Sequence, residues 1–189
     1  MGRVHIIGDS HALTFQGAKD IDCHWMGAAT AHNLYKKYDL IASIFKKAND
    51  YDKFWFCFGE IDCRLHLYRQ HKTHNKTEFS LIMDTTDNYI GAVNRFSDYN
   101  IGIMAVPPQG YQDNFYDFEF YASREHRQQL TDVFNFVLEN KCLQTNIPFI
   151  DIWEQEGLWS EESFREDACH IKNEMATQCL VRYLERSRD

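Results

Sequence analysis

Five short apolar runs along the chain predict buried strands. They are Val4–Ile7, Ile21–Met26, Phe54–Phe58, Ile101–Val106 and Pro148–Trp153. Runs of this length bounded by turn residues are typical of strands, and their alternation with helical periodicity predicts a parallel sheet. The third run is apolar at every position, as expected of a central parallel strand buried on both faces. We therefore expect one three-layer α/β domain over residues 1–189, with a central sheet of about five parallel strands.

Helical periodicity fills the intervals between these runs. A short amphipathic stretch follows the first run directly, and longer helices are predicted over Leu40–Ala48, Ser123–Lys141 and Asn173–Arg186. Two further stretches are interpreted as loop insertions at the carboxyl ends of strands, where α/β sheets hold their ligand sites. Residues 69–76 are basic and polar, so we expect a solvated loop or one that meets an acidic glycan or a phosphorylated substrate. Residues 111–121 are rich in aromatic side chains, which form a hydrophobic cluster or cover a pocket.

Composition and charge narrow the class of protein. Hydrophobic residues make up 44% of the sequence, which is ordinary for a globular domain. The formal net charge of −8, from 20 Lys and Arg and 28 Asp and Glu, argues against a nucleic-acid binder. The sequence shows no apolar run of transmembrane length and no signal-peptide pattern, so we expect no membrane insertion. The 6 cysteines form no CxxC pair and are interpreted as free thiols of a cytoplasmic protein, a phage or viral one included.

The first apolar run leads directly into Gly8-Asp9-Ser10, and this junction carries the first candidate chemistry. A strand followed at once by a helix places Ser10 in the turn at the helix N-terminus. Free backbone N–H groups and the helix dipole favour negative charge there, so a serine can attack and the resulting oxyanion can be held. Serine is also a preferred N-cap residue, and capping of the helix is the alternative role for Ser10.

A second candidate pair precedes the last predicted helix. Asp167 and His170 stand three positions apart in a predicted turn, a spacing at which the two side chains can hydrogen-bond. A carboxylate in that position fixes the imidazole tautomer and stabilises the imidazolium form. A local capping or surface pair is the alternative, since aspartate is common in turns and at helix starts. In a doubly wound sheet the loop after the last strand lies near the end of the first, so His170 and Ser10 are expected to meet.

In their order along the chain, these segments resemble the sequence blocks of the GDSL/SGNH hydrolase superfamily over nearly the whole length. Gly8-Asp9-Ser10 resembles the first block and Gly27 the glycine of the second. Gly59-Glu60-Ile61-Asp62 stands where the family has Gly-x-Asn-Asp, and Asp167-Ala168-Cys169-His170 resembles the last block. The resemblance implies the three-layer, flavodoxin-like SGNH-hydrolase fold.

The same resemblance implies roles for individual residues. Ser10 would be the nucleophile, His170 the general base and Asp167 the acid that orients it. The backbone N–H groups of Ser10 and Gly27 would hold the oxyanion of the reaction. No metal and no other cofactor is implied.

The third block departs from the family pattern at one position. Ile61 stands where the family has an asparagine whose amide donates to the oxyanion, and an isoleucine side chain cannot donate. Loss of one such donor typically lowers the rate about 100- to 1000-fold. Arg64 is a candidate replacement, because a guanidinium can hydrogen-bond an oxyanion. A salt bridge from Arg64 to Glu60 or Asp62 is the alternative role.

Four polar residues near these blocks are candidates for substrate binding or for support of the site. Asp9 is interpreted as bonding within its own turn rather than taking part in catalysis. Glu60 and Asp62 flank Ile61 in the third block, and His66 follows shortly after them. We expect all four side chains to lie around the serine.

The remaining histidines and cysteines near the motifs are given structural roles. The spacing of His66, His71 and His74 does not fit a helical pair of metal ligands, so no metal site is expected. His11 is expected to point away from the site, as a packing or capping histidine. Cys169, between Asp167 and His170 in the sequence, is interpreted as a small buried filler or a reactive thiol.

The function favoured by the sequence is a serine esterase that acts on small O-acyl groups, with O-acetyl on carbohydrate as the first expectation. The partner would be a small ester or an O-acylated glycan, and the small residues Ala28, Ala29 and Ala31 near Gly27 favour a small acyl group. A lipase, a thioesterase or an O-acyltransferase of the same fold would use the same acyl-enzyme. A non-catalytic module that binds glycans or a protein is the alternative from another class, favoured by the missing asparagine.

Overall fold

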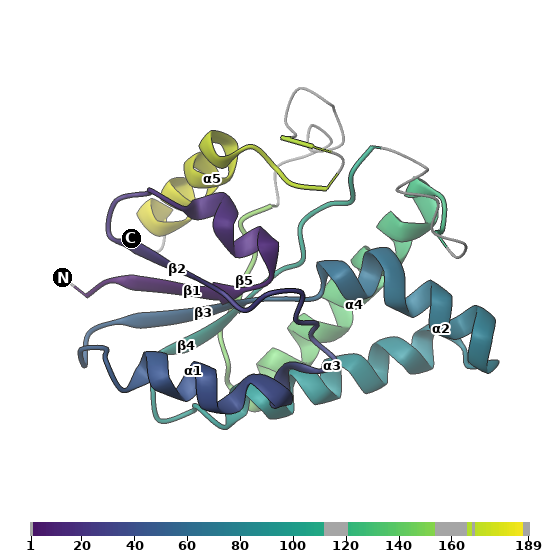
Figure 1. Cartoon of the computed structure of the whole chain (residues 1–189), viewed down its shortest axis with the longest axis horizontal. Coiled ribbons are helices and arrows are strands. Elements are labelled where there is room, and N and C mark those ends of the chain that lie inside the picture. The colour runs from purple at the N-terminus through teal and green to yellow at the C-terminus, as the bar shows by residue number, and fades with distance from the viewer. Residues whose placement is uncertain (1, 112–120, 154–165, 168, 187–189) are drawn as a thin grey trace.

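The computed structural model describes residues 2–111, 121–153, 166–167 and 169–186. Its centre is a sheet of five strands that all run parallel, in the order β2-β1-β3-β4-β5. The strands are β1 (Val4–Gly8), β2 (Ile21–Trp25), β3 (Lys53–Cys57), β4 (Ile101–Met104) and β5 (Phe149–Ile150). The parallel sheet with helices on both faces, seen edge-on in Figure 1, confirms the predicted α/β fold.

Helices cover the two faces of the sheet unequally. A short 3₁₀ helix, η1 (Ser10–Phe15), and the last helix, α5 (Asn173–Arg186), lie on one face. The other face carries α1 (Tyr38–Phe45), α3 (Glu78–Asn94) and α4 (Arg124–Thr145). The described part of the chain also contains η2 (Leu34–Lys37), a π-helical turn η3 (Asp62–His66) and α2 (Leu67–His74).

The central strand β3 contributes to both hydrophobic cores. Successive side chains of a strand point to opposite faces. Phe54 and Phe56 pack among the side chains of α1, α3 and α4, whereas Trp55 and Cys57 pack among those of η1 and α5. All four are at most 5% exposed, which explains why the run is apolar without alternation.

The winding of the sheet reverses at β1, and this reversal positions the site. β2 pairs with one edge of β1 and β3 with the other. In open α/β sheets a crevice forms at such a switch point, beyond the carboxyl ends of the strands. Gly8 ends β1 there, and a Cβ atom at this glycine would come within 2.4 Å of the Cys57 carbonyl oxygen. Only glycine therefore fits at the close approach of β1 to β3.

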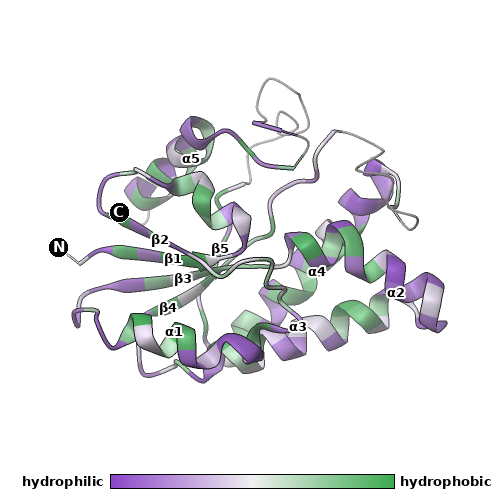
Figure 2. Ribbon diagram, in the orientation of Figure 1, coloured by the Kyte–Doolittle hydropathy of each residue, from purple (hydrophilic) through white to green (hydrophobic). Residues whose placement is uncertain are grey.

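The expectation of a loop at residues 69–76 was wrong. Most of this segment belongs to α2, which continues directly from η3 and ends where Asn75 adopts a left-handed φ of 51°. Figure 2 shows α2 as predominantly hydrophilic. Leu67 is its one buried residue, so polarity reflects an exposed helix here rather than the absence of a helix.

Helix α3 was not predicted from the sequence. Thr77 caps its N-terminus by accepting a hydrogen bond from the Ser80 backbone N–H at 3.2 Å. The buried face of this 17-residue helix includes Thr85 and Thr86 among its apolar residues, and these threonines obscured the periodicity. Residues 112–120 of the aromatic-rich segment lie outside the described part of the chain. Within that part, no helix is long and apolar enough to cross a membrane.

Candidate active site

Ser10 is the first residue of η1, directly after the turn at Asp9 that ends β1, so it lies at the helix N-terminus as the sequence predicted. Asp9, not Ser10, is the N-cap residue: its Oδ1 accepts the His11 backbone N–H at 2.9 Å. The Ala12 backbone N–H also donates to the Asp9 carbonyl oxygen at 3.1 Å, which closes the turn. The capping role considered for Ser10 thus belongs to Asp9, and the Ser10 hydroxyl is directed to another partner.

That partner is His170, 160 positions away along the chain. His170 Nε2 lies 2.8 Å from Ser10 Oγ, and His170 Nδ1 lies 2.8 Å from Asp167 Oδ2. The second oxygen of the carboxylate, Asp167 Oδ1, accepts the backbone N–H groups of Cys169 and His170, each at 2.7 Å. The structure therefore brings hydroxyl, imidazole and carboxylate into one continuous hydrogen-bonded chain.

The carboxylate of Asp167 is held in its ionised form. Burial alone would raise the pKa of Asp167, but the hydrogen bonds from the His170 and Cys169 backbones and from the His170 ring lower it to about 2. An ionised carboxylate beside Nδ1 favours the tautomer in which Nδ1 carries the proton and Nε2 can accept one. In that tautomer Nε2, the ring nitrogen that faces Ser10 Oγ at 2.8 Å, can accept a hydrogen bond from the hydroxyl.

Beside Ser10 and His170 lies an open cavity of about 280 Å³. Its walls come from η1, from the loop around His170 and from the start of α5, and include Leu13, Thr14 and Asn173. A volume of this size suits a small ligand group more than a bulky one.

Gly27 follows β2 at the same edge of the sheet as Ser10. Its φ of 73° is in the left-handed region that favours glycine, and a Cβ atom built there would meet nothing within 4 Å. The Met26 backbone N–H donates to the Gly8 carbonyl oxygen at 2.8 Å, which ties this loop to the end of β1. Asp62 Oδ2 accepts the Ala31 backbone N–H at 2.7 Å and fixes the far end of the loop.

Arg64 forms a salt bridge with Glu60, which is one of the two roles that the sequence analysis considered for it. Its Nε lies 2.6 Å from Glu60 Oε1, and both side chains are largely buried. A contribution of Arg64 to an oxyanion would therefore use its terminal guanidinium nitrogens. Asp62, the other acidic neighbour considered, instead holds the Ala31 backbone, and burial raises its pKa to about 7.

His66 lies in a different cavity from Ser10. This second cavity, of about 400 Å³, lies between the loop after β2, α2 and α3, and is lined by Thr30, His32, Asp62, His66, Gln70 and Thr85 among others. Burial and the nearby Arg69 lower the pKa of His66, which favours its neutral form. Of the four supporting residues expected around the serine, Asp9 and Glu60 lie behind it, whereas Asp62 and His66 line this separate cavity.

Sequence reasoning misjudged His11. This side chain was expected to point away from the site, but it is buried and its ring centroid lies 4.7 Å from that of His170. Cys169 is buried as expected, and none of the six cysteines, all within the described residues, takes part in a disulfide. The described residues include no group of three or more His, Cys, Asp or Glu side chains that could hold a metal ion.

Comparison with known proteins rests on structure alone. No family model matches the chain, and no curated protein matches its sequence. Among solved structures, an aryl esterase from M. smegmatis has a TM-score of 0.66 at 13% identity, with 100% of this chain and 99% of that chain covered. A lipase/acylhydrolase from Enterococcus faecalis has a TM-score of 0.61 at 16% identity, covering 99% and 97%.

A catalytic mutant of an acetylxylan esterase from Geobacillus stearothermophilus is similar to the same degree. Its TM-score is 0.61 at 15% identity, with 98% of this chain and 93% of that chain covered. Identities this low show the fold alone. The chain therefore has the three-layer fold of GDSL/SGNH-type esterases and acylhydrolases, and its activity is argued below from its own residues.

Proposed function

We propose that this protein is a serine esterase of the GDSL/SGNH class. The observation that carries the proposal is the hydrogen-bonded chain from Ser10 Oγ through the His170 ring to Asp167, with both links at 2.8 Å. A nucleophile, a base and a group that orients the base are the parts that acyl transfer needs. The similarity of the fold to those of esterases and acylhydrolases supports the same conclusion.

The reaction follows from these positions. His170 Nε2 takes the proton of Ser10 as Oγ attacks the ester carbonyl, and the Asp167 carboxylate stabilises the resulting imidazolium. The oxyanion is held by the backbone N–H groups of Ser10 and Gly27, with Arg64 as the candidate third donor. His170 then protonates the leaving alcohol. Water repeats the sequence on the acyl-enzyme and releases the acid.

The substrate we propose is a small O-acyl ester, with O-acetyl on a carbohydrate as the first candidate. The cavity of about 280 Å³ beside Ser10 favours a short acyl group. Ala29 and Ala31, which suggested a small acyl group in the sequence, belong to the hydrophobic core and do not line this cavity. One solved structure of similar fold is described as an acetylxylan esterase, which supports the same substrate class.

The proposal is tested by measuring the hydrolysis of p-nitrophenyl acetate and p-nitrophenyl butyrate. The proteins to compare are the wild type, Ser10→Ala and Ser80→Ala. We expect Ser10→Ala to lose about 10,000-fold or more in kcat, as triad serines do. Ser80 lies at the exposed N-terminus of α3, so its variant serves as the matched control with unchanged rates. A fluorophosphonate should label the wild type once, at Ser10. Undiminished hydrolysis by Ser10→Ala, or no hydrolysis by the folded wild type, would refute the esterase proposal.

A further inference from the structure

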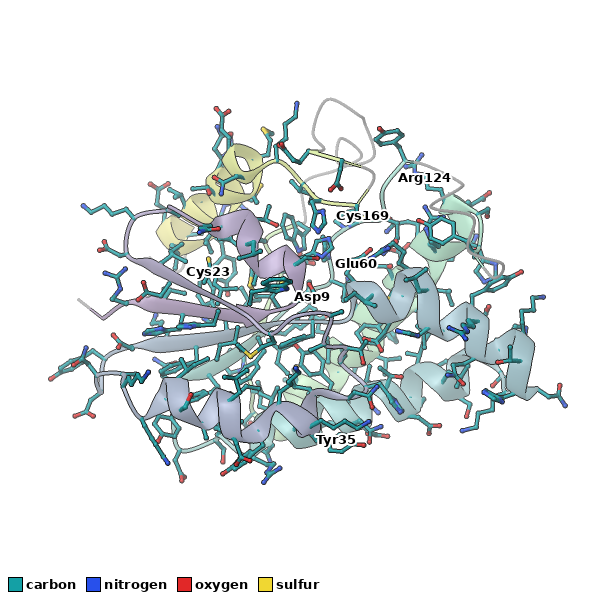
Figure 3. The ribbon with its side chains drawn as sticks, in the orientation of Figure 1. Asp9, Cys23, Tyr35, Glu60, Arg124 and Cys169 are labelled. Carbon is teal, nitrogen blue, oxygen red and sulfur yellow. The ribbon has the colours of Figure 1, made fainter. Side chains whose placement is uncertain are left out.

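Four ionisable side chains lie buried directly behind the Ser10–His170 pair. Asp9, His11 and Glu60 are at most 4% exposed, and the side chain of Arg64 is 11% exposed. His11 Nδ1 lies 3.2 Å from Asp9 Oδ1 and 3.9 Å from Glu60 Oε2, while Arg64 Nε lies 2.6 Å from Glu60 Oε1. Figure 3 shows Asp9, Glu60 and Cys169 gathered beyond the ends of the central strands. Burial of four ionisable groups is costly, so a cluster this close to the candidate nucleophile is a candidate for a role in the site.

The hydrogen-bond partners of His11 define its protonation state. Its Nδ1 faces the Asp9 carboxylate, and its Nε2 lies 3.3 Å from the Cys169 carbonyl oxygen. A backbone carbonyl can only accept, and a carboxylate also accepts. Both ring nitrogens must therefore carry a hydrogen for both bonds to form, and this is the imidazolium form of His11.

With both carboxylates ionised, the charges of the cluster balance in that form. The carboxylates of Asp9 and Glu60 are then matched by the cations His11 and Arg64. Burial alone would lower the pKa of His11, but Glu60 and Asp9 raise it above its ordinary value. Burial alone would raise the pKa of Glu60, but His11 and Arg64 lower it. Paired charges of this kind are the ones that folded proteins tolerate in their interiors.

We propose that His11 is a positioning residue for His170, a buried imidazolium that braces the His170 loop through the Cys169 carbonyl and lies against the His170 ring. The two rings are 4.7 Å apart between centroids and tilted by 32°, so His11 supports one face of the imidazole. This role rests on the proposed esterase function, because it concerns the base of that reaction.

The imidazolium also affects the charge of His170. Among the residues that the structure describes, the ionisable groups near it include Asp167 and Glu166 on its own loop, Asp9 beside η1, Glu60 just before η3 and Arg64 within η3. Cys57, at the end of β3, adds no charge, because burial keeps the pKa of its thiol well above the ordinary value. A positive His11 offsets Glu60 and Asp9 and so disfavours protonation of His170.

The first test measures the protonation of His11 without reference to activity. In the full chain labelled with ¹⁵N-histidine, the ring nitrogens of His11, assigned by comparison with His11→Phe, should show two protonated nitrogens near neutral pH. A neutral ring would overturn the proposal. The same spectra follow the titration of His170, which should move to higher pH in His11→Phe.

The second test measures the positioning role through activity. His5→Phe is the matched control, because His5 is also buried, also bonded to a carboxylate (Asp52, at 3.3 Å) and also stacked on an aromatic ring. We expect His11→Phe to lose about 100-fold in kcat, the typical cost of a base misplaced by about 1 Å, with little change in KM. The acid limb of the profile of kcat against pH should move to higher pH in His11→Phe. In His11→Gln the amide can still donate to Cys169, so the loss should be smaller and the pH shift retained.

The outcomes separate the two proposals. The wild type could be inactive and still show a doubly protonated His11, with a shifted His170 titration in His11→Phe. That result would refute the esterase proposal but would support the positioning role of His11. The wild type could instead be active through Ser10. The positioning role of His11 is then refuted if His11→Phe, shown to be folded by its thermal unfolding transition, has the same kcat and pH profile as His5→Phe.

Discussion

His170 Nε2 lies 2.8 Å from Ser10 Oγ although 160 positions separate the two residues along the chain. The contact exists because β1 is an interior strand of the sheet, paired on both sides, and the loop before α5 returns to its carboxyl end. Ser10 comes from the turn after β1, whereas His170 comes from that loop. Asp167 is the third member of the same hydrogen-bonded chain.

Asp167→Asn should lower kcat about 10,000-fold, because an amide can hold His170 in the wrong tautomer while leaving the geometry intact. Asp167 has a pKa of about 2 in the folded protein, so it stays ionised at every pH of interest. The acid limb of kcat/KM against pH should therefore contain one ionisation, that of His170. Asp98→Asn, at an exposed position, is the control and should leave the profile unchanged. Equal rates for the two variants would contradict the role of Asp167.

Gly27→Ala should be destabilising and should impair activity. The φ of Gly27 is 73°, and an alanine in left-handed backbone costs about 1–2 kcal/mol even though the space for its methyl group is open. Gly91 is the matched control, because it also has open space for a Cβ atom but lies inside helix α3. Gly91→Ala should be stabilising by about 0.5–1 kcal/mol. Urea unfolding compares the two, and a destabilised Gly91→Ala beside an unaffected Gly27→Ala would contradict the argument.

The sequence predicted the parts of the fold whose residues form local patterns. The apolar run at Phe54–Phe58 and the Gly8-Asp9-Ser10 turn each depend on neighbours in the sequence, and both lie where they were expected. The pairing of the strands followed from their alternation with helices. Asp167 and His170 also lie close enough to bond at their short spacing.

The missed features depend on contacts that the sequence does not contain. Helix α2 has few apolar residues because it is exposed, and α3 buries Thr85 and Thr86 through contacts with other elements. His11 turns inward because Asp9 and the distant Cys169 carbonyl both accept from its ring. Residue type and spacing alone gave no indication of that arrangement.

Arg64 can be tested for its two roles separately. Arg64→Ala removes the nearer of the two cationic side chains that face the buried Glu60 and should be destabilising by about 3–5 kcal/mol. Lys76→Ala, which removes the exposed Lys76–Asp84 pair, should cost at most about 1 kcal/mol. The double variant Arg64→Met, Glu60→Gln should recover much of the loss in Arg64→Ala. If Arg64 also donates to the oxyanion, the double variant should remain about 100- to 1000-fold slower in kcat. Full recovery of kcat together with stability would assign Arg64 to the salt bridge alone.

A pair of histidines, His5 on β1 and His24 on β2, should make the stability of the protein depend on pH. His5 Nδ1 lies 2.9 Å from His24 Nε2, so the two rings share one proton and cannot both be charged in this contact. Burial, and then the neighbouring His5, lower the pKa of His24 below its ordinary value of about 6.5. The folded state thus binds fewer protons here than the unfolded state, and stability should fall as the pH drops below about 6.5.

Urea unfolding of the wild type and of His24→Gln across that range measures the effect. The glutamine can still hydrogen-bond His5 but does not titrate, so the pH dependence in mildly acidic buffer should be weaker in the variant. The control is His126→Gln. His126 is half-exposed on α4 and is paired with Glu78, so its replacement should not weaken the loss of stability at low pH in this way. An identical pH dependence in the wild type and His24→Gln would show that the histidine pair contributes nothing to it.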